Sequence, residues 1–308
     1  MKRNYIHATM NFRSWQPLFF FVLVAFASAS DGAAAAEPTS VEASGLLAKY
    51  KQLRPRLESN AFQKPLYLES NESNGEIQAD VYTVLDYPHA TVTSELKQPT
   101  IWCDILILHP NTKYCRPASQ GDKTVLKVNI GKKLDQPLEQ SYRVDFDYQV
   151  LSAGPDYLAV YLNAAKGPFG TQNYRFLLEA APLNARQSFI HLAYSYSYGT
   201  AAKLALMAYL KTSGSHKVGF TVTGHADDGQ PVYIRGVRGL MERNTMRYQL
   251  AIETYFGALS TPAEARPEKR LTDYYAASER YPLQLHDVER EDYLALKRKE
   301  LTRQQSTM

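Results

Sequence analysis

Alternating apolar and polar positions run through the middle of the chain. In residues 75–86 every second side chain from Ile77 to Leu85 is apolar or threonine, and the positions between them are mostly polar. This period of two is typical of a strand with one buried face. The pattern returns in segments separated by turn residues, at 66–69, 124–130, 142–150, 157–162, 174–178, 187–198 and 216–223. It predicts an antiparallel meander of strands.

Helical spacing is found between and after these strands. The longest such pattern covers 236–259, where apolar residues return every three or four positions. Shorter helices are predicted at 41–54, ended by Pro55, and at 90–96, 100–105, 199–210, 271–281 and 288–304. The segment 199–210 has few polar positions. It is interpreted as an ordinary buried helix, with a lid over a pocket or a membrane-touching helix as alternatives.

The order of elements around residues 75–115 carries a family resemblance. The strand 79–86 is followed by Pro88, Val92 and Leu96, and then by Pro99 and Trp102 in an L-x-x-P-x-x-W spacing. This arrangement resembles the START-like superfamily, the helix-grip fold shared by polyketide cyclases, plant pathogenesis-related proteins and lipid-transfer domains. The resemblance implies an α+β fold in which a curved antiparallel β-sheet grips a long C-terminal helix, often around an apolar ligand. The segment 236–259 would be that helix.

The first 36 residues have the form of a secretory signal peptide. Lys2, Arg3 and Arg13 precede an apolar run at 18–27, and small-residue cleavage sites follow at Ala29 and Ala36. The run is shorter than the roughly 20 residues that span a bilayer. An uncleaved amphipathic anchor is the alternative. The sequence therefore predicts a soluble protein exported to the periplasm or the cell exterior, with no membrane span in the mature chain.

The rest of the chain is divided by these patterns into three parts. They are a helical leader at 37–64, a START-like domain at 65–260 and a helical C-terminal extension at 261–308. The last predicted helix is basic, so the stretch 271–304 is also a candidate docking surface for a partner protein of the cell envelope.

The chain contains only two cysteines, Cys103 and Cys115. An even number of cysteines in an exported chain indicates a disulfide formed in an oxidising compartment. Buried free thiols and a metal pair are the alternatives, although no neighbouring histidine or cysteine spacing supports a metal. The predicted disulfide is structural.

Charge and motifs exclude several classes of function. The formal net charge is +4, which is too mild for a nucleic-acid partner without a clustered basic face. The sequence has no glycine-rich phosphate loop, no G-x-S-x-G, no H-E-x-x-H and no C-x-x-C. No catalytic residue, metal site or cofactor is predicted.

Aromatic side chains supply the candidate binding site. The chain has 22 tyrosines, and a tyrosine combines apolar area with a hydroxyl that needs a partner when it is buried. Inward-facing rings could line a cavity for a mostly apolar ligand with a polar end, or they could simply fill the core. The predicted ligand-binding residues are Trp102, Phe146, Tyr148, Phe176, His191, Tyr194, Tyr196 and Tyr248.

Three functions are consistent with these features. The first is a non-catalytic exported protein that binds a small apolar molecule or lipid between sheet and helix. The second is an enzyme of the cyclase type, in which a pocket acid or base such as His191 assists proton transfer. The third is an envelope interaction protein with a solid core, which would leave an apolar stripe exposed on 271–304.

Overall fold

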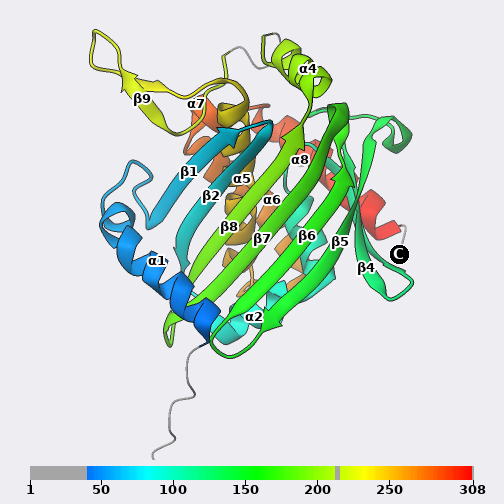
Figure 1. The fold of residues 1–308 in the computed structure, drawn as a ribbon. Coiled ribbons are helices and arrows are strands. Elements are labelled where there is room, and N and C mark those ends of the chain that lie inside the picture. The colour runs from blue at the N-terminus through cyan, green and yellow to red at the C-terminus, as the bar shows by residue number, and fades with distance from the viewer. Residues whose placement is uncertain (1–39, 212–215, 307–308) are drawn as a thin grey trace, which may run out of the picture. The chain divides into compact units, whose positions relative to one another are not determined.

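An eight-stranded antiparallel sheet forms the centre of the protein (Figure 1). The computed structural model describes residues 40–211 and 216–306, so the predicted signal peptide lies outside the described residues. The strands follow in the order β1-β2-β8-β7-β6-β5-β4-β3. Their bounds are Leu66–Ser73 (β1), Glu76–Leu85 (β2), Thr112–Gln120 (β3), Lys123–Ile130 (β4), Tyr142–Ala153 (β5), Leu158–Lys166 (β6), Thr171–Asn184 (β7) and Gln187–Tyr198 (β8).

The helix-grip arrangement is confirmed by this topology. Strand β2 leads into α2 (His89–Leu96) and α3 (Pro99–Leu106), the chain then makes the meander β3 to β8, and β8 returns to pair with β2. The long helix α5 (Gly236–Gly257) lies behind the sheet in Figure 1 and packs on β1, β2 and β8. The protein is therefore an α+β protein whose antiparallel sheet holds a long helix on one face.

The edge strand β1 is longer than predicted. Its hairpin with β2 turns at Asn74 and Gly75, whose φ angles are 52° and 79°. Positive φ at both central residues is the geometry of the two-residue turns that match the twist of antiparallel strands. The sequence pattern predicted a strand only at 66–69, but pairing continues up to Ser73 opposite Glu76.

Helix α1 (Val41–Glu58) covers part of the other face of the sheet (Figure 1). Its buried residues Leu46, Leu53 and Leu57 pack in one cluster with Tyr82 and Phe189. The prediction that Pro55 ends this helix is wrong. Proline removes one hydrogen bond from a helix, but the turn that follows buries Leu57 to 3% exposure. That burial favours one more helical turn.

The predicted strand at 216–223 is also wrong. Residues 217–221 are irregular, and Val222–His225 (β9) pairs only with Pro231–Tyr233 (β10) in a separate two-stranded sheet. Both neighbours of β8 are already occupied, by β2 and β7, so the main sheet offers this segment no free edge beside β8. Helix α4 (Thr200–Lys211) is not a buried helix either, because Leu204 is 65% exposed.

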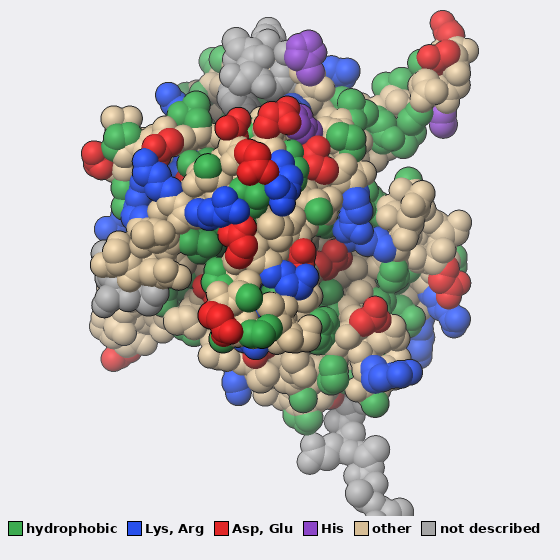
Figure 2. Space-filling view, turned by 180° about the vertical axis from the view of Figure 1, so that it is seen from behind, with side chains coloured by type: hydrophobic (Ala, Val, Ile, Leu, Met, Phe, Trp, Pro, Cys, Tyr) green, Lys and Arg blue, Asp and Glu red, His purple; other side chains and the backbone are tan. Residues whose placement is uncertain are grey.

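The C-terminal helices share the core of the sheet. Helices α6 (Arg266–Glu279), α7 (Pro282–Leu285) and α8 (Arg290–Ser306) contribute Leu271, Tyr274, Leu285, Tyr293 and Leu294 to the same buried cluster as the strands. On the side opposite to the view of Figure 1, acidic and basic side chains are interspersed (Figure 2). Among the described residues of 271–304, Leu283 is the one large apolar side chain that is exposed, so these helices present no apolar stripe.

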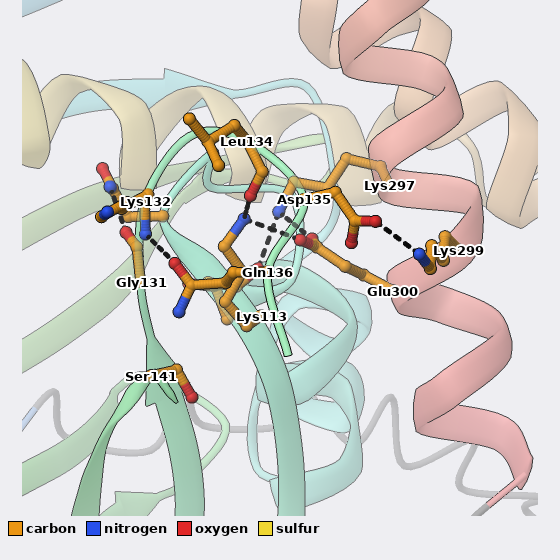
Figure 3. Close-up of polar contacts among 12 residues, drawn as sticks. Lys113, Gly131, Lys132, Leu134, Asp135, Gln136, Ser141, Lys297, Lys299 and Glu300 are labelled. Atoms are coloured by element: carbon orange, nitrogen blue, oxygen red, sulfur yellow. Dashed lines mark hydrogen bonds and ion pairs between the residues drawn. The ribbon is translucent and has the colours of Figure 1, made fainter. Parts of the chain in front are cut away.

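A buried ion network fixes α8 against β3 (Figure 3). Glu300 accepts hydrogen bonds from Lys113 at 2.8 Å and from Lys297 at 2.7 Å, and all three side chains are at most 1% exposed. The two ammonium groups also donate to backbone carbonyls, Lys113 to Leu134 and Lys297 to His109 and Thr112. Buried charges are tolerated when they are paired and hydrogen-bonded in this way.

The predicted disulfide is present. Cys103 of α3 and Cys115 of β3 are joined across a sequence separation of 12 residues, with their Cα atoms 5.1 Å apart. Both cysteines are buried, and the bond ties the helical segment to the edge of the sheet. Within 40–211 and 216–306, no helix is both long and apolar enough to cross a membrane.

Candidate binding site

Eight aromatic residues gather between the sheet and α5, and we call them the aromatic cluster. Tyr248 of α5 lies at its centre, with ring centroids 5.2 Å from Phe176 and 5.4 Å from Tyr194. Strand alternation places the sheet residues on this face, because side chains two apart in a strand point the same way. The members are Trp102, Phe146, Tyr148, Tyr174, Phe176, Tyr194, Tyr196 and Tyr248.

The rings of the aromatic cluster pack against one another. Trp102 meets Phe176 edge to face at 5.5 Å, and Tyr174 stacks on Tyr196 at 5.1 Å. Two hollows stand out among the described residues, and neither lies among these rings. One is a cavity of about 20 Å³ beside Tyr274 and Asp287, and the other is a surface depression at Asn184 and Gln187. Where these rings meet, ring-to-ring contacts occupy the space between the sheet and the helix.

Three polar side chains of the cluster have hydrogen-bond partners in neighbouring residues. The Trp102 indole N–H and the Tyr148 hydroxyl both donate to the carbonyl of Leu96, at 2.8 and 3.2 Å. The Tyr174 hydroxyl lies 2.7 Å from that of Thr171. Burial raises the pKa of Tyr174 to about 12, because it disfavours the phenolate. The hydroxyls are thus neutral and can serve a ligand as hydrogen-bonding groups.

Exposure is uneven across the cluster. Phe146 and Tyr248 are only partly buried, whereas Trp102, Phe176 and Tyr194 are at most 7% exposed. The cluster members that keep some solvent-accessible surface are therefore Phe146 of β5 and Tyr248 of α5.

A group of charged residues lies at one end of the aromatic cluster. His109 packs on Tyr248 with ring centroids 5.0 Å apart. Burial is the main cause that holds the pKa of His109 well below its usual range, and repulsion from Arg247 and Lys133 lowers it further. Arg247 and Lys133 both contact Asp287, at 2.6 and 2.5 Å. Cationic side chains therefore lie beside the aromatic cluster, near His109 and Tyr248.

The structure places the predicted residue His191 away from the other seven. His191 lies on the face of the sheet that α1 partly covers, stacked on Tyr82 at 4.3 Å. Its Nδ1 is 2.6 Å from Glu179 and its Nε2 is 2.8 Å from Asp80. It does not line the aromatic cluster, because side chains alternate along β8 and that of His191 points to the opposite face of the sheet from Leu192, Tyr194 and Tyr196.

The electrostatics of His191 follow from these contacts. Burial opposes its charged form, but hydrogen bonds to Asp80 and Glu179 outweigh that effect and raise the pKa of His191. Both ring nitrogens act as donors in the protonated state, so the imidazolium bridges two carboxylates. Within the part of the chain that the structure describes, no group of three or more His, Cys, Asp or Glu could hold a metal ion.

Sequence reasoning missed Tyr174 as a cluster member and missed the charged end altogether. Tyr174 alternates with Phe176 and could have been found by that spacing. The charged residues come from four separate parts of the chain. Lys133 lies in a loop and Lys217 in an irregular segment, whereas Arg247 belongs to α5 and Asp287 to the connection between α7 and α8. No spacing in the sequence links them, since only the tertiary fold brings them together.

Comparisons with known proteins gave distant structural likenesses. No protein-family model matches the chain, and no curated protein sequence does. A conserved protein of unknown function from Enterococcus faecalis is similar in structure over 83% of this chain and 98% of its own, at 9% identity and a TM-score of 0.31. A STAR-related lipid transfer protein from Xanthomonas axonopodis matches 48% of this chain and 86% of its own, at 9% identity and a TM-score of 0.34.

An aromatase/cyclase from Streptomyces is similar over 67% of this chain and 93% of its own length, at 10% identity and a TM-score of 0.31. Likenesses this distant carry no argument about a ligand or a reaction. The strand order, the gripped helix and the aromatic interior of this chain define it as a helix-grip α+β protein on their own.

Proposed function

We propose that the protein binds a small, mostly apolar molecule, such as a lipid acyl chain, between the sheet and α5, without catalysis. The observation that carries this proposal is the aromatic cluster, in which residues from α3, β5, β7, β8 and α5 supply apolar area together with neutral hydroxyls. Apolar walls with a few placed polar groups are the usual composition of a small-molecule site.

Binding at this site requires side chains to move. Since these rings are in contact with one another, a ligand enters by displacing the partly buried Phe146 and Tyr248. The ligand then replaces ring-to-ring contacts with contacts of similar apolar character. For the same buried ligand area, a preformed pocket binds more tightly, because ordering and displacing side chains reduce the free energy gained on association. The proposal therefore implies moderate affinity.

We also propose that this binding takes place outside the cytoplasm. The leader-like pattern of residues 1–36 supports export, and so does the Cys103–Cys115 bond, because disulfides persist in oxidising compartments. The functional form would then be the chain cut after Ala29 or Ala36.

A cyclase-type enzyme is the second candidate, and one observation favours it. His109 and Lys133, at the end of the aromatic cluster, both have lowered pKa values, as acid–base groups in active sites often do. The two candidates differ in outcome, since a binding protein returns its ligand unchanged and an enzyme does not.

The first test is native mass spectrometry of the protein purified from the compartment in which it accumulates. A reproducible added mass, identified after organic extraction, is the expected result. The second test uses the probe 1-anilinonaphthalene-8-sulfonate. We expect Tyr248→Ala to change the dissociation constant of this probe by about fivefold or more, since one aromatic contact contributes about 1 kcal/mol or more.

Tyr161→Ala is the matched control, because Tyr161 lies on the opposite face of β6 from the residues that join the main core. It removes the same side chain and should leave probe binding unchanged. The proposal fails if the purified protein carries no ligand and Tyr248→Ala and Tyr161→Ala bind the probe as the wild type does.

A further inference from the structure

Three cations converge on a single carboxylate beside the aromatic cluster, and we call this group the cation cluster. Asp287, 5% exposed, is contacted by Arg247 at 2.6 Å, by Lys133 at 2.5 Å and by Lys217 at 3.6 Å. The cluster therefore carries more positive charge than its one carboxylate balances.

The imbalance is not corrected elsewhere in the described residues. Within 40–211 and 216–306, neither Lys133 nor Arg247 has a second acidic group within 4.0 Å. The Lys217 ammonium also donates to the carbonyl of His286, which carries no full charge. Partly buried cations without a full counter-charge lose hydration that is not replaced, which is unfavourable. In keeping with this, burial and repulsion by Arg247 lower the pKa of Lys133 to about 7.

A second, independent feature is a set of buried polar atoms without partners around the same carboxylate. His109 Nδ1 accepts from the Asn111 N–H at 3.1 Å, so in the neutral ring the proton is on Nε2, and this buried donor has no partner. The hydroxyls of Tyr274 and Ser278 are also buried and unpartnered, and both line the small cavity that Asp287 borders. Buried donors of this kind are normally satisfied by a partner.

The cluster is accessible from solvent on one side. The side chains of Lys133 and Lys217 are 25% and 26% exposed, whereas Arg247 is 2% exposed. An incoming group would therefore meet the two lysines first and reach the guanidinium last. The cavity itself, at about 20 Å³, has room for a water molecule and no more. The open side at the lysines is thus the place for a larger group.

We propose that the cation cluster is a binding site for an oxyanion of the sulfate, phosphate or carboxylate type. The anion would bridge the ammonium groups of Lys133 and Lys217 and supply negative charge to balance the positive charge that Asp287 alone does not balance. The group could be a free anion or the acidic head of an amphipathic ligand whose apolar part enters the aromatic cluster. The second case rests on the proposed function, and the first does not.

Sulfate is the probe of choice, because its charge does not change between pH 6 and pH 9. At pH 6.5 and constant ionic strength, we expect calorimetric titration to show sulfate binding to the wild type and about tenfold weaker binding to Lys133→Met, since that variant loses a charge-assisted hydrogen bond to the anion. Lys132→Met is the matched control, because Lys132 is the exposed neighbour in the same loop. It should bind as the wild type does.

A second measurement uses the unmodified chain and so does not depend on the folding of a variant. Sulfate should raise the pKa of Lys133, followed by NMR of a sample labelled at lysine Nζ, by about one unit. Between pH 6 and pH 8.5 the affinity for sulfate should fall as Lys133, which faces Asp287 and Arg247, loses its proton, while His109 stays neutral. Equal binding by Lys133→Met and the wild type, or an unmoved Lys133 pKa, overturns the proposal.

Octyl sulfate, well below its micelle concentration, separates the two sources of the anion. If the anion is the head of an amphipathic ligand, octyl sulfate binds more tightly than sulfate, and Tyr248→Ala weakens octyl sulfate but not sulfate. If octyl sulfate and sulfate bind the wild type equally tightly, the site takes a free anion and the proposed apolar function loses its support. Binding of octyl sulfate that is unaffected by Lys133→Met would keep the apolar site and reject the anion site.

Discussion

At the scale of single residues, position on a strand decides what a side chain can do. His191 and Tyr194 belong to the same strand, yet one is bridged between two carboxylates under α1 and the other lies in the aromatic cluster. Because His191 has Asp80 and Glu179 as its partners, its charged form is stabilised in the folded protein. We interpret His191 as a structural group that joins β2, β8 and β7.

This interpretation predicts a specific pH dependence. The folded pKa of His191 is raised above its unfolded value of about 6.5. Its contribution to stability is therefore fully present below pH 6.5 and is lost as the pH rises through the folded pKa. At pH 6 we expect His191→Gln to lower the free energy of unfolding by about 1–3 kcal/mol, since hydrogen bonds to charged groups are being removed.

Urea unfolding of the two proteins from pH 5.5 to pH 8.5 checks this prediction. The difference between wild type and His191→Gln should be largest at the acidic end and shrink as the pH increases. A difference that stays constant over the whole range would show that folding does not raise the pKa of His191.

At the scale of elements, the attachment of α8 depends on one buried carboxylate. Glu300 is the only acidic partner of Lys113 and Lys297 among the described residues, and burial lowers the pKa of Lys297 to about 8 despite that pairing. Glu300→Gln would leave two buried ammonium groups without a counter-charge. We expect a loss of about 3–5 kcal/mol in the free energy of unfolding.

The loss should be localised at first. Amide hydrogen exchange of Glu300→Gln is expected to be faster in α8 and at Lys113–Cys115 of β3 than in β7 and β8. Glu291→Gln serves as the control in the same helix, because the Glu291 side chain is 77% exposed. If both variants exchange as the wild type does, the ion network does not hold α8 in place.

At the scale of the whole molecule, the disulfide reinforces a fold that depends on contacts between distant segments. Strand β2 pairs with β8 across more than a hundred residues of chain, and α5 and α8 pack on strands that precede them by far. Such a topology is slow to form, since long loops must close before their contacts are gained. Covalent closure between α3 and β3 reduces the freedom of the unfolded chain near the start of the meander.

Cys103→Ser combined with Cys115→Ser should therefore lower the global stability by about 3 kcal/mol, the entropy expected for a loop of this size. Urea unfolding monitored by circular dichroism is the measurement. The wild type in dithiothreitol should behave as the double variant does, because the chain has no other cysteine. An unchanged unfolding midpoint in both experiments would mean that packing alone holds α3 on β3.

Much of the fold could be predicted from local patterns. The strand β8 was predicted with its observed bounds, 187–198, and α5 with its start at Gly236, because uninterrupted periodicity of two or of 3.6 is a strong local signal. The errors lie where tertiary packing overrides that signal. Pro55 does not end α1 because Leu57 is buried, and 216–223 does not join the sheet because both sides of β8 are taken.

The candidate sites divide in the same way. Seven members of the aromatic cluster were predicted from the sequence, because strand alternation and helical spacing place each ring on a known face of its own element. The disulfide was predicted because the chain offers one pairing only. The burial of Glu300, the position of His191 under α1 and the convergence of three cations on Asp287 were decided by the tertiary structure. Interactions between charges depend on distance and burial, and neither is encoded in the spacing of residues along the chain.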